Sequence, residues 1–211
     1  NLTKSLNIED NLTGALSLNS SGSQHVNNTN VYETQVINDL SYQSEDKFLN
    51  NGIINKFNVL FKNVNSTGKN SAQYKNSVET ELLSSLLFES SYPLLREGIG
   101  FNNYFTPKLS LRYSPNSMKN LKNEDRRIDI NNIWSIDRIA SASTIESGQS
   151  LTVGAEYKKS RNIDINETVV SDEEYPIDVF ELSLATVFRD EKNENLPLTS
   201  TLGDKSSDIV G

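Results

Sequence analysis

Two carboxylates in this sequence come closest to a site for acid–base chemistry. Glu79 and Glu81 lie two positions apart in a stretch that alternates between apolar and polar residues. On a strand they would share one face, about 7 Å apart, a separation that suits a pair of catalytic carboxylates. The plainer interpretation, which we favour, is that both are charges on a face turned to water.

Cations at strand positions form a second candidate group. Lys56, Lys62, Lys108 and Arg112 could contact lipid phosphates or the carboxylates of a partner, since both pair with ammonium and guanidinium groups. Solvation inside a water-filled lumen is the alternative that we favour. The Asp-Arg-Arg cluster at 125–127 could likewise be a surface site for sugar phosphates or a solvated cluster of charges.

The composition leaves little room for other catalytic chemistry. The chain of 211 residues has no Cys and a single His, His25, which lies in a run rich in Ser and Asn. Thiol catalysis, Cys-ligated zinc and disulfides need Cys, and Ser-His triads or His-based metal sites need more His than this. We therefore expect no enzyme, no metal site, no cofactor and, with 28 acidic against 20 basic residues, no nucleic-acid partner.

The segment 105–115 is the clearest of the elements that would position these residues. Its apolar residues, Leu109 and Leu111 among them, fall on one side of an extended strand, with an aromatic residue towards each end. Lys108 and Arg112 fall on the other side. A strand with one apolar and one cationic face is therefore expected here.

The same alternation recurs along the chain. Further strands are expected at 1–8, 12–18, 31–43, 52–65, 74–91, 128–136, 150–158 and 180–189, with another beginning at 206–211. A helix is the rival at 74–91, where pairs of Leu fit either period. Polar loops are expected at 20–30, 44–52, 66–71, 116–127, 137–148, 159–176 and 190–205. About ten strands without intervening helices predict an all-β fold built as an antiparallel meander.

Two all-β architectures fit this pattern. A transmembrane helix needs about 20 apolar residues, which the sequence lacks, whereas a spanning strand needs only about 9–11 alternating residues. Strands of about 10–15 residues with aromatic residues near their ends favour part of a large transmembrane outer-membrane β-barrel over a β-sandwich.

In such a barrel, alternate side chains would face the lumen and the lipid. The residues expected to face the lumen are Lys56, Lys62, Glu79, Glu81, Lys108, Arg112 and Glu156. Those expected to face lipid are Phe57, Phe61, Leu109, Leu111, Tyr113, Trp134 and Tyr157.

Four stretches, taken in order, carry a more specific resemblance. They are Leu-Phe-Glu-Ser-Ser-Tyr-Pro at 87–93, Thr-Pro-Lys-Leu-Ser-Leu-Arg-Tyr-Ser-Pro at 106–115, Glu-Ser-Gly-Gln-Ser-Leu-Thr-Val-Gly-Ala-Glu-Tyr at 146–157, and Phe-Arg at 188–189 with Asn-Leu-Pro at 195–197 and Lys-Ser-Ser-Asp-Ile-Val-Gly at 205–211. Together they span residues 87–211 and resemble the barrel of the lipopolysaccharide-assembly outer-membrane protein family, LptD or OstA.

The resemblance implies a barrel in the outer membrane of a Gram-negative bacterium that inserts lipopolysaccharide into the outer leaflet. It implies lipopolysaccharide, an LptE-like lipoprotein plug, periplasmic lipopolysaccharide-bridge proteins and the membrane as partners. Residues 1–211 would be an incomplete barrel domain of wall strands and loops, with the periplasmic domain and the barrel-closing strands outside it. The family's structural disulfides have no counterpart among these residues. The residues alone leave two alternatives open, another outer-membrane barrel such as a porin or receptor channel, and a surface-exposed β-sandwich adhesin.

Overall fold

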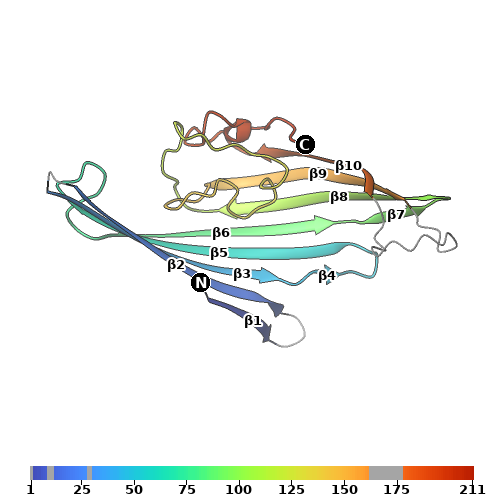
Figure 1. Cartoon of the computed structure of the whole chain (residues 1–211), viewed down its shortest axis with the longest axis horizontal. Coiled ribbons are helices and arrows are strands. Elements are labelled where there is room, and N and C mark those ends of the chain that lie inside the picture. Colours follow the sequence, from blue (N-terminus) through green and yellow to red (C-terminus); the bar gives the residue numbers. More distant parts are fainter. Residues whose placement is uncertain (1, 9–11, 28–29, 162–177) are drawn as a thin grey trace, which may run out of the picture.

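A computed structural model describes residues 2–8, 12–27, 30–161 and 178–211, and these form one long twisted sheet (Figure 1). In order along the sheet the strands are β1-β2-β3-β5-β6-β8-β9-β10, each antiparallel to its neighbour, with β4 paired to β5 and β7 to β8. The bounds are β1 Leu2–Ile8, β2 Leu12–Asn27, β3 Val31–Ser44, β4 Lys47–Phe48, β5 Ile54–Lys69, β6 Glu79–Ser91, β7 Leu94–Glu97, β8 Phe101–Ser114, β9 Gly148–Arg161 and β10 Asp178–Arg189. The predicted all-β antiparallel meander is confirmed.

Most of the strands are unusually long. Seven of them have 12 to 16 residues, against about five or six in an ordinary sheet. The predicted loops at 20–30 and 66–71 are wrong for this reason, since β2 continues to Asn27 and β5 to Lys69. These strand ends are polar on both faces, so apolar alternation does not mark them, and pairing with β3 holds them extended.

The predicted strand at 128–136 is also wrong. Residues 115–147 form an irregular segment of turns that folds back over one face of the sheet, with β8 and β9 on either side of it in the chain (Figure 1). We call residues 115–147 the folded loop. The chain turns repeatedly in this segment, and its apolar residues alternate in sequence because they are the ones that pack into the protein. Ile133, for example, is only 1% exposed.

The folded loop and the segment after β10 make the main hydrophobic core. This core packs against Ala185 and Val187 of β10, and its other members are Met118, Leu121, Ile133, Ile139, Leu196 and Leu202. The predicted strand at 206–211 reduces to two isolated bridges, Phe188 with Ser206 and Ala185 with Val210. A short 3-10 helix, η1 (Thr201–Gly203), lies in the same segment, and Ser200 caps it by accepting a hydrogen bond from the Leu202 N–H.

Within the described residues, no helix has the length and apolar character needed to cross a membrane. The predicted loop at 159–176 lies almost wholly outside the described residues.

Candidate functional site

The sheet has two chemically different faces. Cross-strand pairing brings Lys62, Arg112 and Arg189 onto one face, where the folded loop lies, and we call it the covered face. The opposite face, the open face, carries residues such as Phe88 and Leu111 directly across from each other. Strand geometry puts successive residues on opposite faces, so each strand contributes to both.

The most distinctive site on the covered face is a buried ionic cluster around Glu146. This carboxylate, which is 0% exposed, lies in the folded loop between three guanidinium groups. Arg138 of the same loop donates to both of its oxygens, from Nε to Oε2 at 2.7 Å and from Nη2 to Oε1 at 2.6 Å. Arg189 of β10 donates to Oε1, and Nη1 of Arg112 of β8 lies 3.2 Å from Oε2.

Further hydrogen bonds from these arginines join the loop to the wall. Arg112 donates from Nη2 to the Glu146 carbonyl at 2.8 Å and from Nε to the Ile136 carbonyl at 3.1 Å. Arg138 reaches the opposite way, from Nη2 to Ser150 Oγ of β9 at 2.9 Å. Each arginine therefore crosses the boundary between sheet and loop, and the cluster holds the two layers together.

Glu146 is ionised in this setting. Burial alone would raise the pKa of the Glu146 carboxyl, because a charge is poorly solvated inside a protein. The charges of Arg112 and Arg138, the hydrogen bond from Arg138 and the charge of Arg189 outweigh that cost and hold the pKa well below its ordinary value. The site therefore contains a fixed negative charge that only its arginines neutralise.

A second buried cation joins the loop to the neighbouring strands. Lys62 of β5, 3% exposed, donates to the Ser141 carbonyl at 2.7 Å and to Asp137 Oδ2 at 3.3 Å, both in the folded loop. Its Nζ also lies 3.8 Å from Asp39 Oδ2 on β3. Burial raises the pKa of Asp137, and the charge of Lys62, which lowers this pKa, offsets only part of that effect.

Sequence reasoning missed most of this site. Arg138 and Glu146 fall in what looked like a polar connection at 137–148, and Arg189 was the last residue of the strand predicted at 180–189. One available signal was that Ile139 and Ile145, 4% and 0% exposed, stand next to these charges. Charges flanked by buried apolar residues in a loop indicate that the loop is packed.

All seven residues predicted to face the lumen lie on the covered face. They are Lys56, Lys62, Glu79, Glu81, Lys108, Arg112 and Glu156. The expected solvation is nevertheless wrong for two of them, because the folded loop buries Lys62 and Arg112 and satisfies their charges itself.

The two glutamates do not form a shared carboxylate site. Glu79 pairs with Lys75, and Glu81 Oε2 lies 3.1 Å from Lys119 Nζ, so each has a lysine of its own. Both are partly exposed. Their arrangement fits separate surface ion pairs.

Six of the seven residues predicted to face lipid share the open face. They are Phe57, Phe61, Leu109, Leu111, Tyr113 and Tyr157. Trp134 is the exception, and its prediction is wrong because the folded loop carries it to the covered face. There its ring atom Cζ2 lies 2.8 Å from where a Cβ on Gly154 would stand, so this glycine makes room for it.

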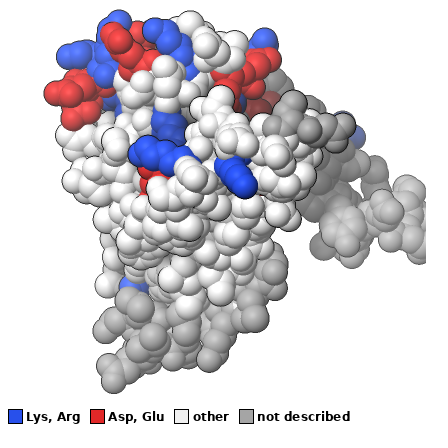
Figure 2. Space-filling view, turned by 90° about the vertical axis from the view of Figure 1, so that its left-hand side faces the viewer, with Lys and Arg blue, Asp and Glu red and all other residues white. Residues whose placement is uncertain are grey.

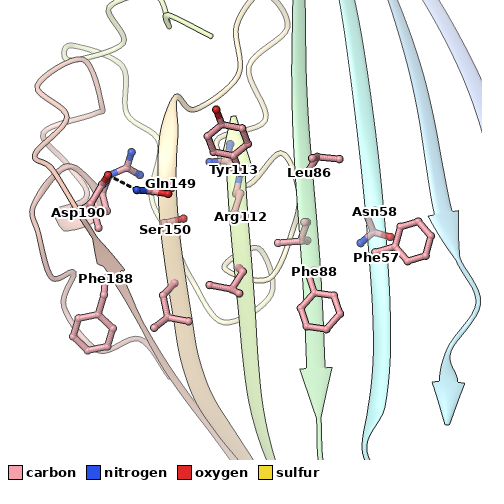
Figure 3. Close-up of a pocket in the computed structure, with 14 residues that line it drawn as sticks. Phe57, Asn58, Leu86, Phe88, Arg112, Tyr113, Gln149, Ser150, Phe188 and Asp190 are labelled. Atoms are coloured by element: carbon pink, nitrogen blue, oxygen red, sulfur yellow. Dashed lines mark hydrogen bonds between the residues drawn. The ribbon is translucent and has the colours of Figure 1, made fainter. Parts of the chain in front are cut away.

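The open face contains a shallow apolar groove of about 650 Å³. Figure 3 shows Phe88, Tyr113 and Phe188 along it, from β6, β8 and β10, while Gln149 donates to Asp190 at 2.7 Å at its polar end. The hydrogen bond from Gln149 lowers the pKa of Asp190. No other layer of the described chain covers this groove.

The Asp-Arg-Arg cluster at 125–127 lies on the outside of the folded loop. Arg126 is occupied inside the loop, where it donates from Nη1 to the Ile139 and Ala140 carbonyls, both at 2.8 Å. Arg127 is 76% exposed in its side chain and pairs with Asp125. In Figure 2 charged residues gather at the top of the view, where Figure 1 places the folded loop and the segment after β10.

Among the described residues, no group of three or more His, Asp or Glu side chains is arranged to hold a metal ion. Comparisons with protein-family models, with curated proteins and with solved structures find no match to this chain.

Replacing Glu146 by Gln should destabilise the fold strongly. The change keeps the side-chain size but leaves three buried guanidinium groups without their counter-charge, which costs about 3–5 kcal/mol. We expect a lower free energy of unfolding in urea and faster tryptic cleavage within the folded loop. Glu124→Gln, which removes a partly exposed partner of Arg126, is the control and should change stability by less than about 1 kcal/mol. Equal stability of the two variants would contradict the role of Glu146.

The contribution of Glu146 should depend on pH in one direction. Because folding lowers its pKa, its stabilisation is complete above the ordinary value of 4.5 and is lost as the pH falls through the lowered value. Asp137, whose pKa folding raises, acts oppositely, so its burial weighs against stability at neutral pH and that effect fades on acidification. The difference in unfolding free energy between the wild type and Glu146→Gln isolates the first effect. It should be largest near neutral pH and shrink below about pH 4, and a constant difference would refute the assignment.

Proposed function

We propose that this chain forms part of the wall of a transmembrane β-barrel in the outer membrane of a Gram-negative bacterium. The open face would contact lipid, and the covered face would contact the lumen. The folded loop would then lie inside the barrel, as a built-in constriction braced against the wall. In this role the chain acts without catalysis.

The exposed apolar face is the observation that carries this proposal. Large apolar side chains follow one another across the strands, with Phe61, Leu111 and Tyr113 46%, 52% and 50% exposed. Further members of the same face are Leu18, Leu40, Leu82, Leu86, Phe88, Leu109, Val153, Leu182, Leu184 and Phe188. Soluble monomers rarely expose a continuous apolar surface of this kind, whereas lipid solvates it.

The position of the second layer argues against a β-sandwich. A sandwich buries the apolar faces of two sheets against each other and leaves the charged faces in water. Here the chain's own second layer, the folded loop, covers the charged face and leaves the apolar face open. A barrel wall with a lumenal loop has this arrangement.

The strand lengths also fit a membrane span. A tilted spanning strand needs about 9–11 residues, and β6, β8, β9 and β10 have 13, 14, 14 and 12. The lumenal ion pairs would avoid lipid entirely, because alternate residues separate the two environments.

The more specific part of the proposal is lipopolysaccharide export, and it rests on the motifs at 87–93, 106–115, 146–157 and 188–211 that resemble LptD. Two of these motifs contain members of the ionic cluster, Arg112 and Glu146, and a third contains Arg189. On this proposal, lipopolysaccharide, an LptE-like plug and periplasmic bridge proteins are the partners. A porin or receptor channel would use the same wall without those partners.

Spin labels on the full-length protein test the wall. These 211 residues contain no Cys. A single cysteine introduced here is therefore the one labelling site, provided that any cysteine elsewhere in the protein is replaced. Labels at Leu111→Cys and Val153→Cys on the open face should collide more with oxygen, which concentrates in lipid, than with a water-soluble nickel complex. Labels at Thr106→Cys and Glu156→Cys, on the covered face, are the matched controls and should show the reverse. Low accessibility to both reagents at 111 and 153 would indicate a buried sandwich interface and reject the wall.

Depletion of the full-length protein in its own bacterium tests lipopolysaccharide export. We expect newly made lipopolysaccharide to be lost from the cell surface and to accumulate in the inner membrane, while other barrels remain folded. Normal surface lipopolysaccharide, with reduced uptake of small solutes instead, would favour the porin or receptor alternative.

A further inference from the structure

A row of uncharged polar side chains crosses four strands on the open face, at the edge of the apolar surface. Its members are Ser20 of β2, Asn38 of β3, Asn63 and Asn65 of β5, and Thr80 of β6. We call it the amide row. Two positions away from Ser20, Asn38 and Asn63 on their strands, Leu18, Leu40 and Phe61 lie side by side in the apolar surface. On β2, β3 and β5 the change from apolar to polar therefore happens within one step of the strand repeat. Val36 and Leu82, which pair with Asn65 and Asn63, keep apolar side chains beside the row.

The amide row is organised by its own hydrogen bonds. Ser20 Oγ donates to Asn38 Oδ1 at 2.6 Å, and Asn38 Nδ2 donates to Asn63 Oδ1 at 3.4 Å. From the other side, Thr80 Oγ1 donates to Asn65 Oδ1 at 2.8 Å, and Asn65 Nδ2 donates to Asn63 Oδ1 at 2.5 Å. The two chains of bonds converge on the single oxygen of Asn63.

This convergence fixes the direction of the Asn63 amide. With its oxygen accepting two bonds from within the row, its nitrogen donates none within the described part of the chain. Asn63 is only half-buried, so both N–H donors are available beside the ring of Phe61. A ligand there would meet preorganised donors next to apolar surface.

The row is uncharged, and this selects among headgroups. On the open face, the row itself and its next neighbours Thr34 and Thr67 carry no charge, and Lys69 at the end of β5 carries a charge further along the same face. The charged residues Asp39, Lys62 and Glu81 of these strands face the other way. Figure 2 shows most charged residues of this end at the top of the view, with a few Lys, Arg, Asp or Glu residues lower down. Phosphate sites use Arg or Lys, whereas amides both donate and accept, as sugar hydroxyls do.

We propose that the amide row binds the uncharged sugar headgroup of a glycolipid whose acyl chains lie on Leu40 and Phe61. This inference rests on the proposed wall role, because it needs the open face to contact lipid. It places the headgroup level of one leaflet at Asn63. The polar ends of β2, β3 and β5 then project beyond the membrane, on the side of the folded loop.

Photocrosslinking in vesicles tests the inference with the full-length protein. A benzophenone amino acid replaces Phe61, and the vesicles are phosphatidylcholine with equal minor fractions of digalactosyldiacylglycerol and phosphatidylglycerol. After irradiation, mass spectrometry measures each lipid's share of the adducts. We expect the glycolipid to be enriched about fivefold over its share of the vesicle, as one net hydrogen bond would give, and Asn63→Leu to abolish the enrichment.

A benzophenone at Val153, on the same face but away from the amide row, is the matched control and should show no enrichment. Two outcomes would overturn the headgroup site but keep the wall. In the first, both positions give lipid adducts but the glycolipid is not enriched over its share of the vesicle; in the second, phosphatidylglycerol is enriched instead. Enrichment that survives Asn63→Leu would also overturn the role of the row. Absence of lipid adducts at both positions would reject the wall itself, and the inference with it.

Discussion

The carboxylate of Glu146 is the contact on which the two layers of this structure depend. Three arginines converge on it from β8, the folded loop and β10, and all three side chains are at most 2% exposed. Guanidinium groups are costly to bury, and a counter-charge with well-placed acceptors is what offsets that cost. The loop therefore cannot leave the sheet without exposing an unsatisfied network, and the apolar core over Ala185 and Val187 is retained with it. Lys62 and Asp137 repeat the same principle on β5, two strands away from β8 in the sheet.

With the buried charges of the covered face paired internally, the open face is the part of the described structure that still needs an apolar environment. The usual arrangement of a soluble protein is inverted here, since ion pairs lie under the second layer and Phe61, Leu111 and Tyr113 point outward. Exposed apolar area on this scale costs free energy in water in proportion to its extent. Lipid removes that cost, and the backbone polar groups between neighbouring strands are already paired, as a membrane requires. The physical case for a membrane wall thus comes from which face the loop covers.

Much of this arrangement was predictable from alternation, and the failures share one cause. The two-residue period of a strand assigns side chains to faces without reference to neighbouring strands, and it put Lys108 and Arg112 on the face opposite Leu111, as the pairing shows. Trp134 was misplaced because alternation inside the folded loop comes from turns, which the period does not distinguish from a strand. The outer parts of β2 and β5 were missed because they are polar on both faces and show no apolar alternation, while pairing with β3 keeps them extended. Glu146 binds side chains up to 43 positions away in the sequence, and no local pattern encodes such contacts.

The folded loop lies at the same end of the sheet as the polar ends of β2, β3 and β5, and this constrains how a barrel built from this wall would work. The folded loop and the polar ends of β2, β3 and β5 both extend from the end where β8 stops and β9 starts (Figure 1). Outer-membrane barrels carry their longer loops on the outer side, so the constriction would stand at the outer mouth of the lumen. Because that constriction is held by buried charges and an apolar core, moving it aside would cost far more than a surface loop's motion. A bulky lipid leaving such a barrel would therefore pass through a part of the wall that this loop does not brace.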